Sequence, residues 1–242
     1  MKAIILAAGQ GSRMGELTKS LPKPLMKFGE QTIISRLVNQ LISRKITNID
    51  IVVGYLYEEI INEINSNFSG AIDINFIINK DYKNDTNIHS AFLGINTIHS
   101  GDFSIFESDC IYSEEAMDII VNSFNDEVSH WYTIGSFHKN QNGGILSAGS
   151  DGKILDIKIV DKYYENFRNY NKLIGLLYVS SAERNLFVKL LSESLKISSK
   201  QYYLQPWIDN LAQFKCTEIP LPDNSSAAFN NNLEYNDALQ IK

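Results

Sequence analysis

The first 25 residues, MKAIILAAGQGSRMGELTKSLPKPL, constrain the fold more than any other stretch of the chain. Residues 3–8 are all apolar, which is typical of a strand that a parallel sheet buries on both faces. Gly9, Gly11 and Ser12 follow directly, and such small residues allow a ligand to approach the backbone N–H groups. We therefore expect the chain to begin with a buried strand and a ligand-binding turn, as an α/β fold does.

Two cations follow the turn. Arg13 has a planar guanidinium that can bind phosphate oxygens in a bidentate way. Lys23 lies between Pro22 and Pro24, and each proline fixes its own φ angle, so the lysine is held in a stiff segment. A triphosphate requires cationic donors of this kind. The opening of the chain therefore indicates nucleotide chemistry.

Apolar periodicity along the rest of the chain predicts alternating helices and strands. The first half has predicted helices at residues 32–43, 58–67 and 87–98 and predicted strands at 48–54, 72–78 and 103–106. The second half has predicted strands at residues 131–137, 143–148, 154–160 and 172–180, a hairpin turn at 150–153, a helix at 182–195, and a loop with a short helix within 223–236. The pattern predicts a three-layer αβα fold with a mixed, mostly parallel sheet, in one domain spanning residues 1–242.

Composition excludes several classes of function. The net charge is −6, so no basic surface suggests a nucleic-acid partner. The apolar runs are far shorter than the roughly 18 residues that a membrane helix needs. Cys110 and Cys216 have neither disulfide-scaffold nor zinc-site spacing, and the N-terminus shows no signal-peptide pattern. We expect a cytoplasmic protein that binds neither nucleic acid nor a membrane.

Residues 6–14 and 22–25 match the LAAGxGxRM and PKPL motifs, in order and at the expected separation. The chain thereby resembles the nucleotidyltransferases of the sugar-nucleotide type, which have a Rossmann-like fold. Residues 84–91 are similar to the NNIxSL segment of the branch that transfers cytidylyl groups to phosphocholine or aminoalkylphosphonates. The resemblance implies a nucleotide-binding half, residues 1–109, and an acceptor-binding half, residues 110–242, with a β-rich insertion on the acceptor side.

The resemblance implies that a phosphate or phosphonate oxygen attacks the α-phosphorus of CTP and that pyrophosphate leaves. Arg13 and Lys23 are then the catalytic residues, which gather the anions and stabilise charge in the transition state. The implied nucleotide-binding residues are Leu6, Ala7, Ala8, Gly9, Gly11, Ser12, Arg13, Lys23, Asn87 and Ser90. Asn87 and Ser90 are suited to reading a pyrimidine edge through their amide and hydroxyl groups.

The resemblance also implies a Mg²⁺ site. Asp109 follows the strand that in relatives ends in a magnesium-binding aspartate. Asn230 lies where relatives carry a second metal ligand before the last helix. Because three asparagines follow one another here, the alignment with the relatives is ambiguous, and Asn232 is the alternative ligand. Magnesium prefers such oxygen ligands and bridges phosphates.

The acceptor region departs most from the family pattern. Residues 202–209 keep the aromatic and acidic side chains of choline-handling relatives, but not their spacing. Residues 174–180 resemble the GIxxxS strand that lines the acceptor pocket. We expect acceptor contacts from Glu107, Lys158, Lys162, Gly175, Trp207 and Asp209, with the choice between Lys158 and Lys162 for the acceptor phosphate left open. The acceptor itself is expected to be a small phosphorylated amino compound.

The sequence leaves three hypotheses about function open. The first is a cytidylyltransferase that supplies an activated head group for decoration of bacterial surface polysaccharide. The second is a sugar-1-phosphate nucleotidyltransferase that uses UTP, dTTP or GTP. The third is a non-catalytic nucleotide-sensing protein. For each, the chain is expected to be a monomer or a homodimer.

Overall fold

Four parallel strands form the centre of the computed structural model, which describes residues 1–68, 70, 72–124 and 127–241. These strands are β1 (Lys2–Ala7), β4 (Asn48–Val53), β5 (Asp73–Ile78) and β6 (Phe103–Glu107). Strand β1 pairs with β4 on one side and β6 on the other, and β4 pairs with β5. Because the strands are parallel, their carboxyl ends meet at one edge of the sheet.

A mixed, largely antiparallel region extends this sheet beyond β6. Its strands are β8 (Ser129–Ser136), β9 (Gly143–Ala148), β10 (Ile154–Val160), β11 (Asn171–Val179) and β12 (Cys216–Pro220). Strand β11 runs antiparallel to β6, β8 and β9, and β9 and β10 form the hairpin predicted from sequence. Within the described residues the sheet has nine strands in the path β10-β9-β11-β6-β1-β4-β5, with β8 joining β11 to β12.

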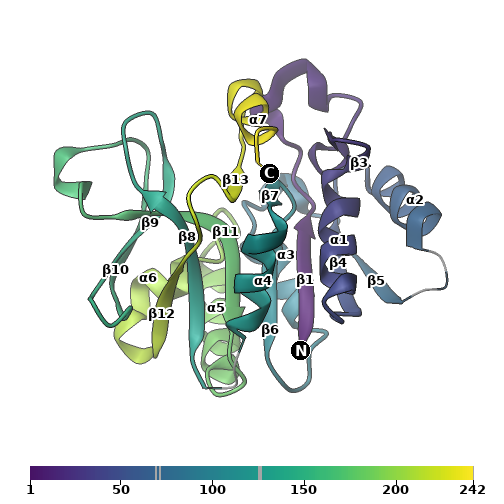
Figure 1. Ribbon diagram of the computed structural model, residues 1–242. Helices are drawn as coiled ribbons and strands as arrows, with labels where there is room; N and C mark the ends of the chain where they lie inside the picture. The colour runs from purple at the N-terminus through teal and green to yellow at the C-terminus, as the bar shows by residue number, and fades with distance from the viewer. Residues whose placement is uncertain (69, 71, 125–126, 242) are drawn as a thin grey trace.

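Helices cover both faces of the sheet (Figure 1). The helices are α1 (Ile33–Ser43), α2 (Tyr57–Phe68), α3 (Ile88–Ile95), α4 (Glu114–Asn122), α5 (Arg184–Ile197), α6 (Gln205–Asn210) and α7 (Asn232–Ala238). Apolar faces of α1, α2 and α4 pack in one core, and those of α3, α5 and α6 pack in the other. The three-layer αβα prediction is therefore confirmed. In the described part of the chain, the helices lack the length and apolar character needed to cross a lipid bilayer.

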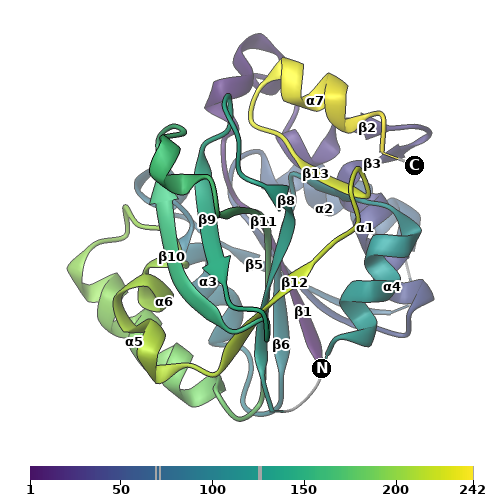
Figure 2. The same cartoon turned by 60° about the vertical axis from the view of Figure 1, so that its left-hand side comes forward.

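Short elements complete the edge at which the central strands end. Strands β7 (Cys110–Tyr112) and β13 (Ser226–Ala228) pair with each other, as do β2 (Lys27–Phe28) and β3 (Gln31–Thr32). Helix α7 and the N-terminal loop lie side by side there in both ribbon views (Figures 1 and 2). Met14, Ile111 and Phe229 share a small core beneath them.

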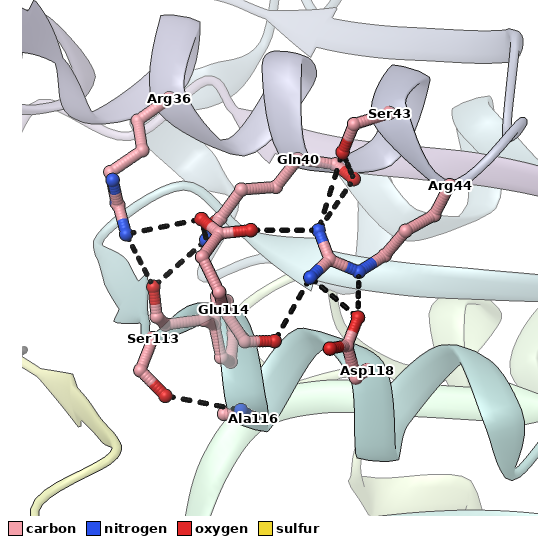
Figure 3. A network of polar contacts seen from close by, with 9 residues as sticks. Arg36, Gln40, Ser43, Arg44, Ser113, Glu114, Ala116 and Asp118 are labelled. Carbon is pink, nitrogen blue, oxygen red and sulfur yellow. Dashed lines mark hydrogen bonds and ion pairs between the residues drawn. The ribbon is translucent and has the colours of Figure 1, made fainter.

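Helix α4 is an element that the sequence analysis did not predict. Ser113 caps it by accepting a hydrogen bond from the Ala116 N–H at 3.1 Å. A polar network holds its first turn against α1 (Figure 3). In this network Gln40 Nε2 donates to Glu114 Oε1 at 2.7 Å, and Arg44 pairs with Glu114 at 3.0 Å. Burial alone raises the pKa of Glu114, but these hydrogen bonds outweigh it and lower the pKa below its usual range.

Helix α3 approaches the sheet at a glycine. A Cβ added at Gly94 would lie 2.6 Å from Ile4 Cγ2 and 3.1 Å from Val52 Cγ2. The helix that carries Ser90 therefore packs directly on β1 and β4, with no space for a side chain at this position.

We expect Gly94→Ala to destabilise the fold, although alanine is the better helix former by ~1 kcal/mol. Overpacking a tight contact costs about 1–3 kcal/mol, so the net change in the free energy of unfolding should be a loss. Urea denaturation measures this free energy. Ser66→Ala, on the exposed side of α2, is the control, because there alanine raises helix propensity without overpacking a contact. An unchanged or higher midpoint for Gly94→Ala would contradict the close packing.

Candidate active site

A cleft of about 290 Å³ opens where the central strands end and the antiparallel region begins. Its lining comes from the loop after β1, the end of β6, the starts of β9, β11 and α3, and the segment before α7. The predicted site residues in its lining are Leu6, Ala8, Gly9, Gly11, Arg13, Lys23, Asn87, Ser90, Glu107, Asp109, Gly175 and Asn230. The structure therefore brings together side chains from segments far apart in the sequence.

The glycine turn closes on the segment that carries Lys23. Gly11 has a φ angle of 62°, in the left-handed region that favours glycine. A Cβ at this position would lie 3.2 Å from Lys23 Cβ and 3.3 Å from Thr18 Cγ2. Thr18 Oγ1 donates to the Gly11 carbonyl oxygen at 2.9 Å. The two cation-bearing motifs thus form one packed loop.

Lys23 is the most highly connected cation of the cleft. Its Nζ donates to Asp109 Oδ2 at 2.6 Å and to the Phe229 carbonyl oxygen. The ammonium also lies 4.6 Å from the centre of the Phe229 ring. Although Lys23 is only 7% exposed, its charge is compensated by a carboxylate, a carbonyl and an aromatic face.

The three consecutive asparagines before and within α7 have different surroundings. Asn230 lines the cleft, and its N–H donates to Glu234 Oε2 at 2.6 Å. Asn231 caps α7, since its Oδ1 accepts from the Glu234 N–H at 3.0 Å. Asn232 is exposed outside the cleft. Of the two asparagines that the sequence left open, Asn230 and not Asn232 therefore lines the same cleft as Asp109.

This pair of oxygen donors fits a magnesium ion that is also bound by substrate phosphates. Mg²⁺ is commonly held by one or two protein carboxylates, with phosphate and water oxygens completing its octahedron. In the described part of the chain, His, Cys, Asp and Glu side chains form no cluster of three or more that could hold a metal alone. Asp109 and Asn230 are thus suited to share a cation with a bound triphosphate.

Glu107 lies deeper in the same wall. Its Oε1 accepts a hydrogen bond from Asn87 Nδ2 at 3.1 Å. Gly175 leaves room for this side chain, because a Cβ at 175 would lie 2.6 Å from Glu107 Cβ. Burial, together with the nearby charge of Asp109, raises the pKa of Glu107 to about 7.

The two residues expected to contact the base are already hydrogen-bonded within the protein. Asn87 Oδ1 accepts from the Tyr203 N–H at 2.9 Å, while its amide donates to Glu107. Ser90 Oγ donates to Asp85 Oδ2 at 2.7 Å and accepts from Asn79 Nδ2 at 2.9 Å. Both residues line the cleft, but their polar groups also fix the start of α3.

Six predicted site residues are not part of the cleft lining: Ala7, Ser12, Lys158, Lys162, Trp207 and Asp209. Ala7 packs in a core, and Ser12 is exposed at the start of a 3₁₀ turn.

The remaining four were expected to contact the acceptor, and the structure places them elsewhere. Trp207 is fully buried because its ring stacks on Phe214, with centroids 3.7 Å apart. Lys158 pairs with Asp156, Lys162 lies over the Tyr164 ring, and Asp209 accepts from Gln205 on the surface of α6.

The structure adds cleft residues that sequence reasoning missed. Lys172, at the start of β11, donates from Nζ to the Leu173 carbonyl at 2.9 Å and to the Gly144 carbonyl at 3.3 Å. Burial lowers the pKa of Lys172, although the charge of Glu107 opposes this shift. Trp131, Asn142, Gly143, Gly144, Tyr202 and Tyr203 also line the cleft. The sequence could have pointed to Lys172, because it is a single charged residue directly before the apolar run of a predicted strand.

Sequence and structure comparisons relate this chain to known nucleotidyltransferases. The nucleotidyl transferase family model matches residues 2–162. The CTP:phosphoglutamine cytidylyltransferase of Campylobacter jejuni is 26% identical over 240 residues, which cover 90% of this chain and 92% of that protein. The 2-aminoethylphosphonate cytidylyltransferase of Lancefieldella rimae is 25% identical over 202 residues, covering 80% of this chain and 73% of that protein.

Other matches cover the fold or only part of a longer protein. The bifunctional protein GlmU of Methanococcus aeolicus is 30% identical over 158 residues, 65% of this chain, and the match spans 36% of that protein. The structure of CTP:phosphocholine cytidylyltransferase from Streptococcus pneumoniae superposes with a TM-score of 0.80 at 22% identity, covering 97% of this chain and 96% of that one. With its loop, its cations and the match over residues 2–162, this chain belongs to the nucleotidyl transferase family.

Proposed function

We propose that this chain is a Mg²⁺-dependent cytidylyltransferase that joins CTP to a small phosphorylated amino compound. Three relatives that match 80–90% of the chain are named for cytidylyl transfer to phosphoglutamine, 2-aminoethylphosphonate and choline phosphate. The GlmU relative, in contrast, matches only 65% of the chain. This favours CTP over the nucleotides of a sugar-1-phosphate nucleotidyltransferase.

The observation that carries the proposal is the convergence of Arg13, Lys23 and Asp109 on one cleft. Lys23 and Asp109 are paired at 2.6 Å, and Arg13 adds an exposed guanidinium at the same cleft that is available to a phosphate. A non-catalytic nucleotide sensor has no need of a carboxylate beside the phosphate-binding cations. The arrangement therefore supports transfer chemistry over nucleotide sensing.

The proposed reaction exchanges one phosphoanhydride bond for another. An oxygen of the acceptor's phosphate or phosphonate bonds to the α-phosphorus of CTP, and the bond from that phosphorus to the β-bridging oxygen breaks. Pyrophosphate leaves with the electron pair. Because the nucleophile is already an anion, no proton has to be removed, and the barrier is dominated by charge repulsion and positioning.

The residues of the donor side divide this work. We assign Arg13 to the β- and γ-phosphates and to the leaving pyrophosphate, and Lys23 to the α-phosphate, where charge rises in the transition state. The backbone N–H groups near Gly9 and Gly11 contact phosphate oxygens. Leu6, Ala8, Asn87 and Ser90 frame the cytosine base.

Asp109 and Asn230 are the proposed ligands of Mg²⁺. Bound there, the ion would neutralise phosphate charge during the transfer. Asp109 also fixes the ammonium of Lys23 at 2.6 Å. That contact keeps the lysine at the strand ends, within reach of an α-phosphate.

We propose that the reaction takes place in the cytoplasm, in keeping with two cysteines that are both buried and free. A role in supplying head groups for surface polysaccharide stays a prediction from the resemblance. The same is true of the expected monomer or homodimer.

We expect CTP to be the preferred donor. Purified protein is incubated with Mg²⁺, 2-aminoethylphosphonate and each of CTP, UTP, dTTP or GTP, and pyrophosphate release is measured. The same four nucleotides are compared by thermal shift, since the preferred one stabilises the folded state by mass action. Release of pyrophosphate with UTP or dTTP and glucose 1-phosphate, but not with CTP, would establish the sugar-phosphate alternative instead.

We expect Lys23→Ala to lower kcat by at least 10²-fold, because removing a transition-state contact costs about 2.7–4 kcal/mol. Lys19→Ala is the matched control, since Lys19 is 70% exposed and pairs only with Glu16 on the same loop. Steady-state kinetics with CTP measure both variants. A Lys23→Ala enzyme within a few-fold of wild type would rule out the catalytic assignment.

We expect Asp109→Asn to raise the Mg²⁺ concentration needed for half-maximal activity, because a neutral amide binds a hard cation more weakly than a carboxylate. The Mg²⁺-dependent part of the thermal shift with CTP should shrink in parallel. Asp73→Asn, at the exposed start of β5, serves as the control. If Mg²⁺ titrations of wild type and Asp109→Asn coincide, Asp109 does not hold the metal.

A further inference from the structure

Lys172 and Glu107 present opposite charges to the same cleft without contacting each other. Both side chains are partly exposed and line the cleft. Among the ion pairs of the described residues, none joins them within 4.0 Å. In the described part of the chain, no direct ion pair therefore occupies these two groups, and both remain accessible to a ligand in the cleft.

Each group keeps bonding capacity that the protein does not use. An ammonium has three N–H donors, and Lys172 gives two of them to the Gly144 and Leu173 carbonyls. For the third, the described residues supply no hydrogen-bond acceptor. A carboxylate has about four acceptor positions, and Glu107 Oε1 receives a hydrogen bond from Asn87. Both groups are therefore held in place and still able to bind.

Lys172 comes from a different part of the fold than the donor-side cations. Arg13 and Lys23 come from the loops that follow β1, and Lys23 is already paired with Asp109. Lys172 comes from the start of β11, where it pairs with Ile145 of β9, and its Nζ donates to the Gly144 carbonyl. Two anionic substrates must meet in this cleft, so the second needs a cation of its own.

We propose that Lys172 and Glu107 together recognise a zwitterionic acceptor with a primary ammonium group. Lys172 binds the phosphate or phosphonate oxygens of the acceptor, and Glu107 accepts hydrogen bonds from its ammonium group. This inference rests on the proposed function, and it assigns to Lys172 the contact that the sequence left between Lys158 and Lys162.

The hydrogen-bonding capacity of Glu107 favours a primary over a trimethylated ammonium, and the aromatic rings of the cleft are only partly open. A quaternary ammonium is bound mainly by open aromatic faces. Here the rings of Trp131 and Tyr203 stack on each other at 5.8 Å with an interplanar angle of 12°. Trp131 meets Trp207 edge to face at 6.0 Å. The faces that Trp131 and Tyr203 turn to each other are thus covered, whereas Tyr202, which also lines the cleft, is 41% exposed. The carboxylate of Glu107 accepts hydrogen bonds that a primary ammonium can donate and a trimethylated one cannot.

The test compares phosphate esters that differ at the ammonium group, with 2-aminoethylphosphonate as a second primary amine. Full-length protein with CTP and Mg²⁺ is assayed with phosphoethanolamine, 2-aminoethylphosphonate, phosphocholine and ethyl phosphate. We expect kcat/KM for the primary amines to exceed that for phosphocholine and for ethyl phosphate by at least ~10-fold, as loss of a charge-assisted hydrogen bond implies.

Variants separate the two charges. Glu107→Gln should abolish the preference for an ammonium over ethyl phosphate. Gly175→Ala should weaken it by displacing the Glu107 side chain. Lys172→Met should raise the KM of every acceptor at least ~10-fold and leave the KM of CTP within about two-fold. Lys162→Met is the matched control, since Lys162 lies outside the cleft.

The outcomes distinguish this inference from the proposed function. If no acceptor gives CTP-dependent pyrophosphate release with wild-type protein, the proposed function fails and this inference fails with it. If wild type is active but prefers phosphocholine, or if Glu107→Gln keeps the ammonium preference, only this inference is wrong. A rise in acceptor KM for Lys162→Met and not for Lys172→Met overturns the assignment of the phosphate contact.

Discussion

The contact of Lys23 with Asp109 and Phe229 ties together three parts of the chain. Lys23 is 86 residues from Asp109 and 206 residues from Phe229, yet its ammonium bonds to both. The N-terminal loop, the end of β6 and the segment before α7 therefore share one cation. Since a buried ammonium is stable only with compensating partners, the rest of the cleft depends on this junction for its shape and its charge.

The donor side of the cleft could be predicted because its residues lie in short motifs at the ends of strands. The apolar run of β1, the turn at Gly11 and the proline-flanked Lys23 are local features that are visible in the sequence. Asp109 follows β6 at the edge where parallel strands end together. The alternation of strands and helices in the first half of the chain, up to β6, was likewise predicted from periodicity, and the structure confirms the three-layer fold.

The acceptor side could not be predicted in the same way, because its residues are placed by long-range pairing. Lys172 reaches the cleft only because β11 pairs with β9 and β6, which brings its ammonium to Gly144. Trp207 was predicted to contact the acceptor, but it is buried against Phe214 and Trp131, which no spacing within residues 202–209 reveals. Helix α4 was missed although Ser113 and two acidic residues mark its start.

The central claim is that the cleft forms a new phosphoanhydride bond between CMP and an acceptor, and the product itself tests this most directly. ³¹P NMR follows a mixture of the protein, CTP, Mg²⁺ and 2-aminoethylphosphonate. Two coupled signals, one from the phosphonate and one from the cytidylyl phosphate, should appear together with free pyrophosphate and in equal amount. Accumulation of CMP and pyrophosphate with the phosphonate signal unchanged would show hydrolysis instead of transfer and would contradict the assignment.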